Sequence, residues 1–274
     1  MHNPAITALG LNWRYLAFEV HPDNLRSAIA GAKAMNFVGL NLTVPHKLLA
    51  LDMVDALDDS AKMWGAVNTV RFEGKTPDGQ WLPFDAFSEP PKDVRAHGFN
   101  TDADAIIRAL REDLNFEPRG KSVLLLGAGG AGRVAALKLA QEGIGELYLI
   151  NRTSSKAEQL AAEPKGVRVH VGYPKNEVDL VLNATSLGLK PGDPLPFDPE
   201  SFSLSRAEAA YDMIYRPAET PFLRAASEAG CRTANGLGML LYQGAKALEL
   251  WSGKTAPITI MREALMQNIY GPST

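Results

Sequence analysis

The chain has 274 residues, of which 46% are hydrophobic and 22% are charged, and it carries a formal net charge of −3 at pH 7. This composition is ordinary for a globular protein of two domains, and the charge gives no broad electrostatic reason to bind nucleic acid or an acidic membrane. No apolar run approaches the roughly 18 residues of a membrane span, and the first residues do not follow a signal-peptide pattern. Cys231 is the only cysteine and the five histidines are scattered, so we expect no disulfide, no metal site and a cytoplasmic location.

The first hundred residues mix helical and extended patterns. In chain order, hydrophobic spacing predicts a helix at 28–34, a strand at 38–42, a helical segment at 46–58 and a strand at 67–72. Prolines and glycines then interrupt the chain between Gly74 and His97, and Asp78-Gly79 is the clearest turn signal. We predict a hairpin with a long loop there.

From residue 101 onward the chain alternates strands and helices. The predicted strands are at 122–126, 147–150, 167–171 and 180–183, and the predicted helices are at 105–114, 133–141, 155–162, 238–251 and 258–269. The first of these strands is an unbroken apolar run, which is typical of a strand covered on both faces. The alternation of strand and helix favours a parallel, doubly wound sheet.

A glycine-rich turn follows that first strand, and it reads Gly127-Ala128-Gly129-Gly130-Ala131-Gly132. In the G-x-G-x-x-G pattern, the first glycine allows a tight turn, the second lets the backbone approach a pyrophosphate, and the third lets the helix pack closely. The helix that follows would direct free N–H groups at the phosphates. The pattern alone also fits a purely structural turn, but a buried strand before it and a helix after it favour a dinucleotide site.

The end of the next strand distinguishes between the two common dinucleotides. NAD-binding folds usually place an acidic residue there for the ribose 2′-hydroxyl, whereas this chain reads Asn151-Arg152-Thr153-Ser154-Ser155-Lys156. The Arg152 guanidinium suits a 2′-phosphate, with Thr153 and Lys156 as further donors. The alternative is that Arg152 and Lys156 are surface residues at a helix start. We predict NADP as the cofactor.

Three polar clusters flank apolar segments in the first half of the chain: Asn41–Lys47, Gly65–Thr69 and Gly98–Asp102. Each borders a predicted strand, where open α/β sheets place ligand-binding groups. Together they suit a small polyhydroxylated ligand. Hydride transfer between an alcohol and a ketone also moves a proton, and Lys47 can supply that group with Asp102 holding it.

Each of these residues also has a structural interpretation. Thr43 and Thr69 suit helix caps or turns. Asn68 and Asn100 suit turns. Lys47 alone is most simply a solvated charge, although a cation at a helix start opposes the helix dipole.

Taken together, the motifs resemble those of the shikimate dehydrogenase family. The family pattern N-[LV]-T-x-P-[FH]-K matches Asn41–Lys47, G-A-[VI]-N-T matches Gly65–Thr69, and G-x-N-T-D matches Gly98–Asp102. Further matches in the second half are the glycine-rich turn, Asn151-Arg152-Thr153, Asn183–Gly188, Tyr211–Tyr215, and Asn235-Gly236 through Tyr242–Gly244. These motifs run in family order from residue 2 to about residue 251, and the specificity lies in the whole set.

The resemblance implies the reversible, NADPH-dependent reduction of 3-dehydroshikimate to shikimate in aromatic amino-acid biosynthesis. The oligomeric state stays open between a monomer and a homodimer. It implies that Lys47 is the catalytic acid–base residue and that Asp102 is its partner. The implied substrate contacts are Thr43, Lys47, Asn68, Asp102, Tyr215 and Gln243. The implied cofactor contacts are Gly127, Ala128, Gly129, Gly130, Ala131, Gly132, Asn151, Arg152, Thr153, Lys156, Thr185, Ser186, Met213 and Gly236, with Asp59 near the nicotinamide.

The sequence departs from the family pattern in two places. Family members begin with a strand and an S-x-S-P segment whose serines bind the substrate carboxylate, whereas this sequence starts at residues that resemble those just after it. Either this sequence is short at its start or the protein is a diverged member; in the second case, the loss of two donors predicts weaker carboxylate binding. The second departure is a long insert between Val70 and Gly98, which we interpret as a surface loop, with a lid or a partner contact as the alternative.

We therefore predict two α/β domains. The substrate domain comprises 1–101 and 238–274, and a Rossmann-type NADP-binding domain with a parallel sheet comprises 102–237. We expect the active site in the cleft between them. Two other functions remain open at this point: a quinate or quinate/shikimate dehydrogenase, and a non-catalytic binding or regulatory homologue.

Overall fold

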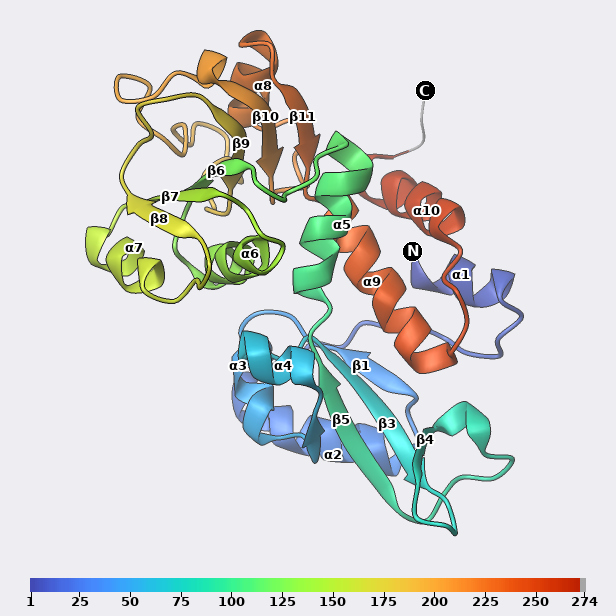
Figure 1. Ribbon diagram of the computed structural model, residues 1–274. Coiled ribbons are helices and arrows are strands. Elements are labelled where there is room, and N and C mark those ends of the chain that lie inside the picture. The colour runs from blue at the N-terminus through green and yellow to red at the C-terminus, as the bar shows by residue number, and fades with distance from the viewer. Residues whose placement is uncertain (272–274) are drawn as a thin grey trace. The chain divides into compact units, whose positions relative to one another are not determined.

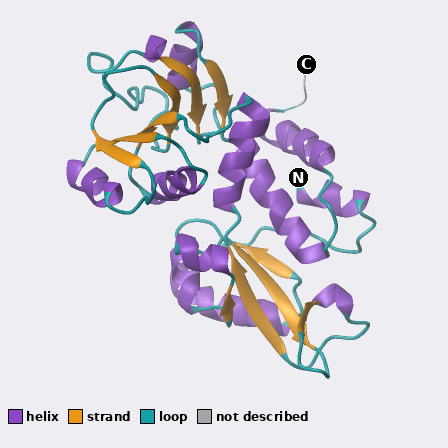
Figure 2. Cartoon of the chain, viewed as in Figure 1, coloured by secondary structure: helices purple, strands orange, loops and turns teal. Residues whose placement is uncertain are grey.

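The computed structural model describes residues 1–271 and divides into two compact units. Unit 1 comprises Met1–Asp102 and Gln243–Asn268, and unit 2 comprises Ala103–Tyr242 and the chain from Ile269. Three helices contribute residues to both units: α5 (Asp102–Leu114), α9 (Leu237–Ser252) and α10 (Ile258–Tyr270). Figure 1 labels the elements, and Figure 2 shows that both units mix helices and strands.

Unit 1 is built on sheet A, whose strands run in the order β1-β3-β5-β2, with β4 paired to the outer part of β3. These strands are β1 (Gly39–Asn41), β2 (Ala56–Leu57), β3 (Thr69–Lys75), β4 (Trp81–Pro83) and β5 (Val94–Phe99). The helices before and between them are α1 (His2–Ala8), α2 (Leu25–Ala34), α3 (His46–Leu49) and α4 (Asp59–Trp64), with short 3-10 turns at Pro22–Asn24, Ala50–Asp52 and Phe84–Ala86. The β2–β5 pair is parallel and the other pairs are antiparallel.

The two faces of sheet A differ because side chains alternate along a strand. Val70 and Phe72 of β3 are fully buried and pack with Leu25 and Ile29 of α2 in the core of unit 1. Helix α2 accordingly lies along one face of β3 and β5 (Figure 1). Glu73 points to the opposite face, where it meets the side chains of Arg71, Arg95 and His97.

The helical segment predicted at 46–58 is wrong beyond its first turn. Helix α3 ends at Leu49, and a 3-10 turn follows at Ala50–Asp52. The chain then becomes strand β2, where the N–H of Asp55 donates to the carbonyl of Ala96 and Ala56 pairs with His97. Pairing with a distant strand therefore overrides the local helical spacing of the apolar residues.

Unit 2 is built on sheet B, a six-stranded parallel sheet with the order β11-β10-β9-β6-β7-β8. Its elements alternate, as the sequence predicts for a doubly wound fold. They are β6 (Ser122–Leu126), α6 (Gly130–Gln141), β7 (Glu146–Ile150), α7 (Ser154–Ala161), β8 (Arg168–Val171), β9 (Val178–Asn183), a 3-10 turn (Leu204–Arg206), β10 (Ala207–Asp212), α8 (Pro221–Glu228) and β11 (Arg232–Asn235). The predicted α/β fold class with a parallel Rossmann-type sheet is confirmed.

The insert between Val70 and Gly98 forms the expected hairpin and loop. Strands β3 and β4 pair antiparallel, with Lys75 opposite Trp81. The predicted turn is present, and Gly79 lies there with a φ of +89°, a backbone conformation that glycine adopts without a steric penalty. The chain continues through a 3-10 turn and a loop to Val94.

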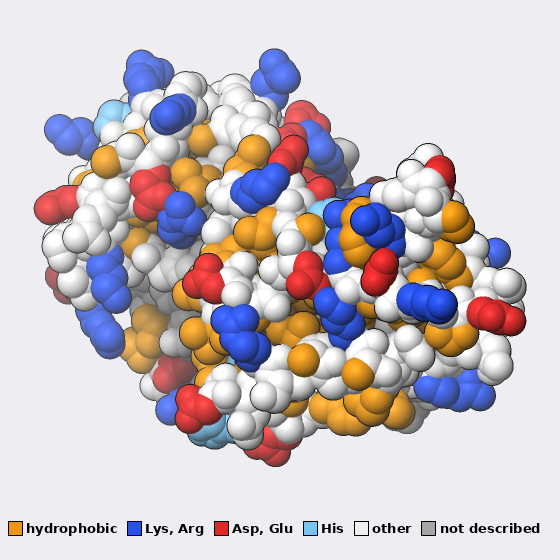
Figure 3. Space-filling view, turned by 90° about the horizontal axis from the view of Figure 1, so that it is seen from below, with side chains coloured by type: hydrophobic (Ala, Val, Ile, Leu, Met, Phe, Trp, Pro, Cys, Tyr) orange, Lys and Arg blue, Asp and Glu red, His pale blue; other side chains and the backbone are white. Residues whose placement is uncertain are grey.

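Within residues 1–271, no helix combines the length and the apolar character needed to cross a membrane. The same residues contain no group of three or more His, Cys, Asp or Glu side chains placed to hold a metal ion. Basic and acidic side chains are interspersed over the face shown in Figure 3, in keeping with the small net charge of −3.

Candidate active site

The three polar clusters of the first half of the sequence meet at one end of the strands of sheet A. Residue pairing places Asn41, the last residue of β1, opposite Thr69, the first residue of β3, and places Thr69 opposite Phe99 at the end of β5. Because β3 runs antiparallel to its neighbours, its beginning lies beside their ends. The clusters at 41–47, 65–69 and 98–102 are thereby brought together within unit 1.

An ion pair lies among these clusters, at this end of the sheet. The Lys47 Nζ lies 2.8 Å from the Asp102 Oδ2, and the two side chains are 26% and 13% exposed. Lys47 is carried by the short helix α3, and its carbonyl accepts from the N–H of Val67, so the lysine backbone is tied to the neighbouring cluster. Asp102 begins α5, where its N–H donates to the Oδ1 of Asn100. Hydrogen bonds thus fix the backbone of both residues, and both side chains remain accessible to solvent.

Asn68 joins the remaining polar groups around this pair. Its side chain is 1% exposed. Its Oδ1 accepts from the Thr101 N–H (2.9 Å), which fixes the amide orientation, so its Nδ2 donates to the Thr101 hydroxyl (3.0 Å) and to the Gln243 Oε1 (3.3 Å). Since the Gln243 oxygen accepts from Asn68, the Gln243 amide nitrogen remains as a donor for a ligand.

A second row of side chains lies behind Asn68. The Asn41 Nδ2 donates to the Thr69 hydroxyl at 3.0 Å, and the Asn41 Oδ1 accepts from the Tyr15 hydroxyl at 3.0 Å. Thr69 in turn donates to the Asn68 Oδ1 at 3.1 Å. Burial raises the pKa of the Tyr15 hydroxyl, so it stays protonated and keeps its donor role. This series of hydrogen bonds, from Tyr15 through Asn41 and Thr69 to Asn68, fixes the side chains of the site in one arrangement.

Two sequence-predicted residues of unit 1 stand apart from this network. Thr43 is exposed, and its carbonyl accepts from the N–H of His46. Asp59, predicted to lie near the nicotinamide, is at the start of α4, where its 94% exposed side chain pairs with Lys62 at 3.0 Å. Neither side chain has a hydrogen bond to Lys47, Asn68 or Asp102 in the part of the chain that the structure describes.

In unit 2, the glycine-rich turn has the geometry of a phosphate-binding loop. Gly127 has a φ of +106°, and a Cβ at Gly132 would lie 2.0 Å from the Gly127 carbonyl oxygen, so both positions require glycine for backbone reasons. By contrast, a Cβ at Gly129 or Gly130 would meet no atom within 4 Å. The fold itself does not need glycine at these two positions, but a ligand lying close to the backbone does.

The residues after β7 surround this turn. The Asn151 Oδ1 accepts from the Ala128 N–H at 3.0 Å, so the donors left for a phosphate begin at Gly129. Arg152 lies just before α7 and Lys156 lies in its first turn, and both are exposed. Among residues 1–271, neither has an acidic partner within ion-pair distance. Two uncompensated cations beside the turn fit a phosphorylated ribose.

The remaining predicted contacts of unit 2 lie on loops at the carboxyl ends of β9, β10 and β11. Thr185 donates its hydroxyl to the Asn183 Oδ1 at 2.7 Å. Met213 follows β10, and its N–H donates to the Asn183 carbonyl at 2.9 Å. A Cβ at Gly236 would lie 2.0 Å from the Met213 carbonyl oxygen, so that loop also requires glycine. Ser186 and Tyr215 are exposed, and Tyr215 accepts from the Tyr270 hydroxyl through its carbonyl.

Several residues of these networks were missed among the predicted site residues. Thr101 connects Asn68 to Gln243, and Asn100 orients Asp102. Both lie inside the Gly98–Asp102 motif, so their position next to Asp102 could have indicated that they belong to the site. Asp212 lies inside the matched Tyr211–Tyr215 motif and offered the same signal, whereas Thr220, which is also buried in unit 2, lies outside every matched motif.

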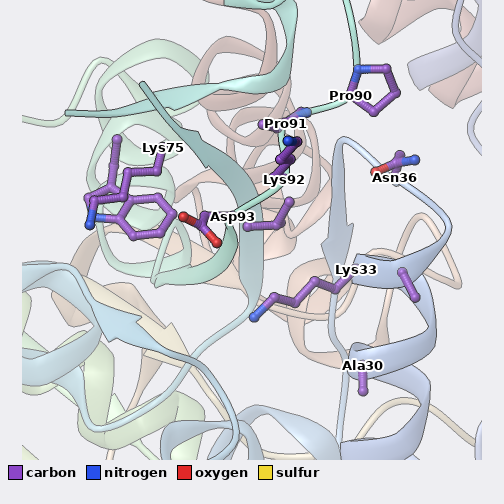
Figure 4. A pocket seen from close by; sticks show the side chains of 11 residues that line it. Ala30, Lys33, Asn36, Lys75, Pro90, Pro91, Lys92 and Asp93 are labelled. Atoms are coloured by element: carbon purple, nitrogen blue, oxygen red, sulfur yellow. The ribbon is translucent and has the colours of Figure 1, made fainter. Parts of the chain in front are cut away.

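A hollow in unit 1 lies elsewhere. It has a volume of about 720 Å³ and is lined by α2, by Lys75 and Trp81 of the hairpin, and by the segment Pro90–Val94 (Figure 4). Lys75 and Val94 are at the ends of β3 and β5 opposite to Thr69 and Phe99. This hollow is therefore at the other end of sheet A from Lys47 and Asp102, and its walls are formed partly by α2 and partly by the insert.

The parallel sheet with its phosphate-binding turn defines unit 2 as a dinucleotide-binding fold, and unit 1 adds a paired lysine and carboxylate suited to proton transfer. Family models match the chain in three places: the shikimate dehydrogenase substrate binding domain at residues 1–70, shikimate / quinate 5-dehydrogenase at 110–186, and the shikimate 5'-dehydrogenase C-terminal domain at 236–266.

Individual relatives agree with these models. The shikimate dehydrogenase (NADP(+)) of Methanopyrus kandleri is 41% identical over 98% of this chain and 90% of its own length. Among solved structures, the Thermus thermophilus shikimate 5-dehydrogenase in complex with NADP(H) and shikimate is 35% identical, with a TM-score of 0.79, 97% of this chain covered and 92% of that one. The 5-ketofructose reductase of Gluconobacter sp. strain CHM43 is 32% identical, with a TM-score of 0.79 and coverage of 97% and 91%. The chain belongs to the shikimate dehydrogenase family.

Proposed function

We propose that the protein is an NADP-dependent shikimate dehydrogenase, an oxidoreductase that interconverts 3-dehydroshikimate and shikimate. The observation that carries this proposal is the Lys47–Asp102 pair, 2.8 Å apart, inside a set of amide and hydroxyl groups suited to a polyhydroxylated ring. Membership of the family and the name of the Methanopyrus relative support the same substrate and cofactor.

Lys47 is the proton donor for ketone reduction. When the carbonyl carbon receives a hydride, negative charge develops on its oxygen, and the Lys47 ammonium supplies the proton that gives the alcohol. In the reverse direction the neutral amine accepts that proton. Asp102 stabilises the ammonium through the 2.8 Å contact and fixes its direction, and solvent access to both side chains lets the lysine be reprotonated. A positioned acid–base group of this kind typically contributes about 10²–10⁴-fold.

The polar groups around the pair orient the substrate. Gln243 presents its amide nitrogen as a donor, since its oxygen accepts from Asn68. The Asn68–Gln243 contact is long at 3.3 Å, so a substrate hydroxyl can replace it with little loss. Thr43 and Tyr215 are assigned as further substrate contacts because their motifs match those of the family, and both side chains are exposed.

NADPH, when bound, supplies the hydride. The residues of unit 2 fit this cofactor: the open backbone at Gly129 and Gly130 accommodates the pyrophosphate, and Arg152 with Lys156 accommodates the 2′-phosphate. Thr185, Ser186, Met213 and Gly236 are assigned to the rest of the cofactor. Asp59 keeps its assignment near the nicotinamide as part of this proposal.

The test is a steady-state assay that follows oxidation of NADPH with a panel of ketones. We expect 3-dehydroshikimate to give the highest kcat/KM, with NADPH preferred over NADH. Turnover of 3-dehydroquinate at a similar kcat/KM would make the protein a quinate/shikimate dehydrogenase, since the description of the central family model names both activities. Preference for 5-ketofructose would assign it the activity of the Gluconobacter relative. No turnover of any ketone would overturn the proposal in favour of a binding or regulatory homologue.

A further inference from the structure

Asp212 is a fully buried carboxylate in unit 2 to which the reaction proposed above assigns no part. It is the last residue of β10, it is 0% exposed, and it lies directly opposite Asn183, the last residue of β9, which is also 0% exposed. Burying a carboxylate is costly unless its oxygens are hydrogen-bonded. Burial accordingly raises the pKa of Asp212, although its hydrogen bonds oppose the rise. Such a residue must be held by well-placed donors.

Three donors meet this carboxylate: one from the end of β9 and two from the two ends of the loop that follows β10. The Asp212 Oδ1 accepts from the Ile214 N–H and from the Asn183 Nδ2, both at 3.0 Å, and the Oδ2 accepts from the Thr220 hydroxyl at 2.6 Å. The last distance is that of a charge-assisted O–H···O⁻ bond. Thr220, which is 0% exposed, also caps α8 by accepting from the Leu223 N–H.

The direction of every bond in this network is determined. The Asn183 Oδ1 already accepts from both the N–H and the hydroxyl of Thr185, at 3.0 and 2.7 Å, so its amide nitrogen has to point at Asp212. The Thr220 oxygen accepts from Leu223, which leaves the Thr220 proton for Asp212. An ionised carboxylate, which only accepts, is therefore the one group of this shape that satisfies all its neighbours.

The network joins the two loops that carry proposed cofactor contacts. Asn183 holds the start of the loop at 184–188 through Thr185, and Asp212 holds the loop at 213–220 at both ends, through Ile214 and Thr220. The loops also pack directly on each other, because a Cβ at Gly188 would lie 3.2 Å from the Thr220 Cβ. Moving Asp212 therefore shifts both loops together.

We propose that Asp212 is a positioning residue for the cofactor, which fixes the loops after β9 and β10 relative to each other through Asn183 and Thr220. The inference rests on the proposed function, since it assigns the cofactor to Thr185, Ser186 and Met213. Asp212 itself contacts no reacting atom. Its effect is on the affinity and placement of NADP.

A matched control exists at the other end of the same sheet. The Asp179 carboxylate also accepts three hydrogen bonds, from the Ser122 N–H (2.8 Å), the Ser122 hydroxyl (2.7 Å) and the Lys121 Nζ (2.8 Å). Asp179 is the second residue of β9, at the amino end of the strand. Its side chain is 28% exposed, so its replacement should disturb the fold less than that of Asp212, and without reaching the loops after β9 and β10.

The experiment measures the NADP⁺ dissociation constant by calorimetry and the Tm of the wild type, Asp212→Asn, Thr220→Val, Thr220→Ser and Asp179→Asn. We expect Asp212→Asn and Thr220→Val to weaken NADP⁺ binding by about tenfold or more, which corresponds to the loss of one loop contact to the charged cofactor when the loops shift. We expect Thr220→Ser, which retains the hydroxyl, to bind like the wild type. Asp179→Asn should lower Tm but leave the dissociation constant within about twofold.

The results separate this inference from the proposed function. Unchanged NADP⁺ affinity in Asp212→Asn, with a wild type that binds, would overturn the positioning role alone. An equal loss of affinity in Asp179→Asn would also overturn it, because general destabilisation would then account for the effect. A wild type that does not bind NADP⁺ would overturn both the proposed function and the inference. If Asp212→Asn fails to fold, the contrast between Thr220→Val and Thr220→Ser decides.

Discussion

Replacing Arg152 by alanine tests the choice of cofactor. Arg152 is exposed just before α7, four residues before Lys156, and neither has an acidic partner among the residues described. A hydrogen bond to a charged group contributes about 1.5–3 kcal/mol. Because the contact is exposed, we take the lower end, which corresponds to about a tenfold weaker dissociation constant for NADP⁺. NAD⁺ has a hydroxyl in place of the 2′-phosphate, so its affinity should change by less than about twofold.

Calorimetric titration of the wild type and of Arg152→Ala with each cofactor measures this directly. Arg168→Ala is the matched control, because Arg168 is another exposed arginine of unit 2 but pairs with Glu146 at 2.8 Å. We expect the control to leave both affinities unchanged. Raising the salt concentration should weaken NADP⁺ binding to the wild type more than to Arg152→Ala, since exposed charge pairs are screened. An equal loss for NADP⁺ and NAD⁺ in Arg152→Ala would refute the reasoning.

Two further predictions concern the glycine-rich turn and the ion pairs of Glu73 with Arg71 and Arg95. Gly132→Ala, whose Cβ would lie 2.0 Å from a backbone oxygen, should lower Tm and abolish NADP⁺ binding. Gly129→Ala, whose Cβ meets nothing within 4 Å, should keep the wild-type Tm in thermal melts but bind NADP⁺ weakly in calorimetry. Equal Tm values for the two variants would contradict this. Although burial opposes ionisation, hydrogen bonds from His97, Arg71 and Arg95 lower the pKa of Glu73 to about 2. A lowered pKa means that the stabilisation is present above the ordinary glutamate value and is lost as the pH falls from about 4.5 toward 2. Glu73→Gln should therefore cost about 3 kcal/mol in urea unfolding at pH 7 and flatten this acid dependence, and an unaltered acid limb would count against it.

Features set by local sequence could be predicted. Strand β6 and the glycine-rich turn after it are an apolar run and a spaced set of glycines, and both are readable without knowing the rest of the fold. The Lys47–Asp102 pair joins two distant parts of the sequence, and it was predicted because each residue lies in a recognised motif. The motifs predict which residues form the site, and the antiparallel pairing of β1, β3 and β5 shows how these residues come together.

Features set by distant partners could not be predicted in this way. Residues 50–57 keep apolar residues at helical spacing, yet parallel pairing with β5 makes Ala56–Leu57 a strand. Strand β10 reads Ala-Glu-Ala-Ala-Tyr-Asp, which has a high helix propensity, and it is a strand because it lies between β9 and β11 in the sheet. The hydrogen-bonding role of Asp212 depends in the same way on Asn183 and Thr220, which local sequence does not connect.

The central claim is that Lys47 transfers the proton. The measurement that tests it most directly is the kcat of Lys47→Ala with saturating 3-dehydroshikimate and NADPH. Lys33→Ala is the control, because Lys33 also pairs with an aspartate, Asp55, at 2.8 Å but is carried by α2. We predict that Lys47→Ala lowers kcat by about 10²–10⁴-fold with a much smaller change in KM, and that Lys33→Ala leaves kcat unchanged. A kcat for Lys47→Ala within about twofold of the wild type would contradict the account.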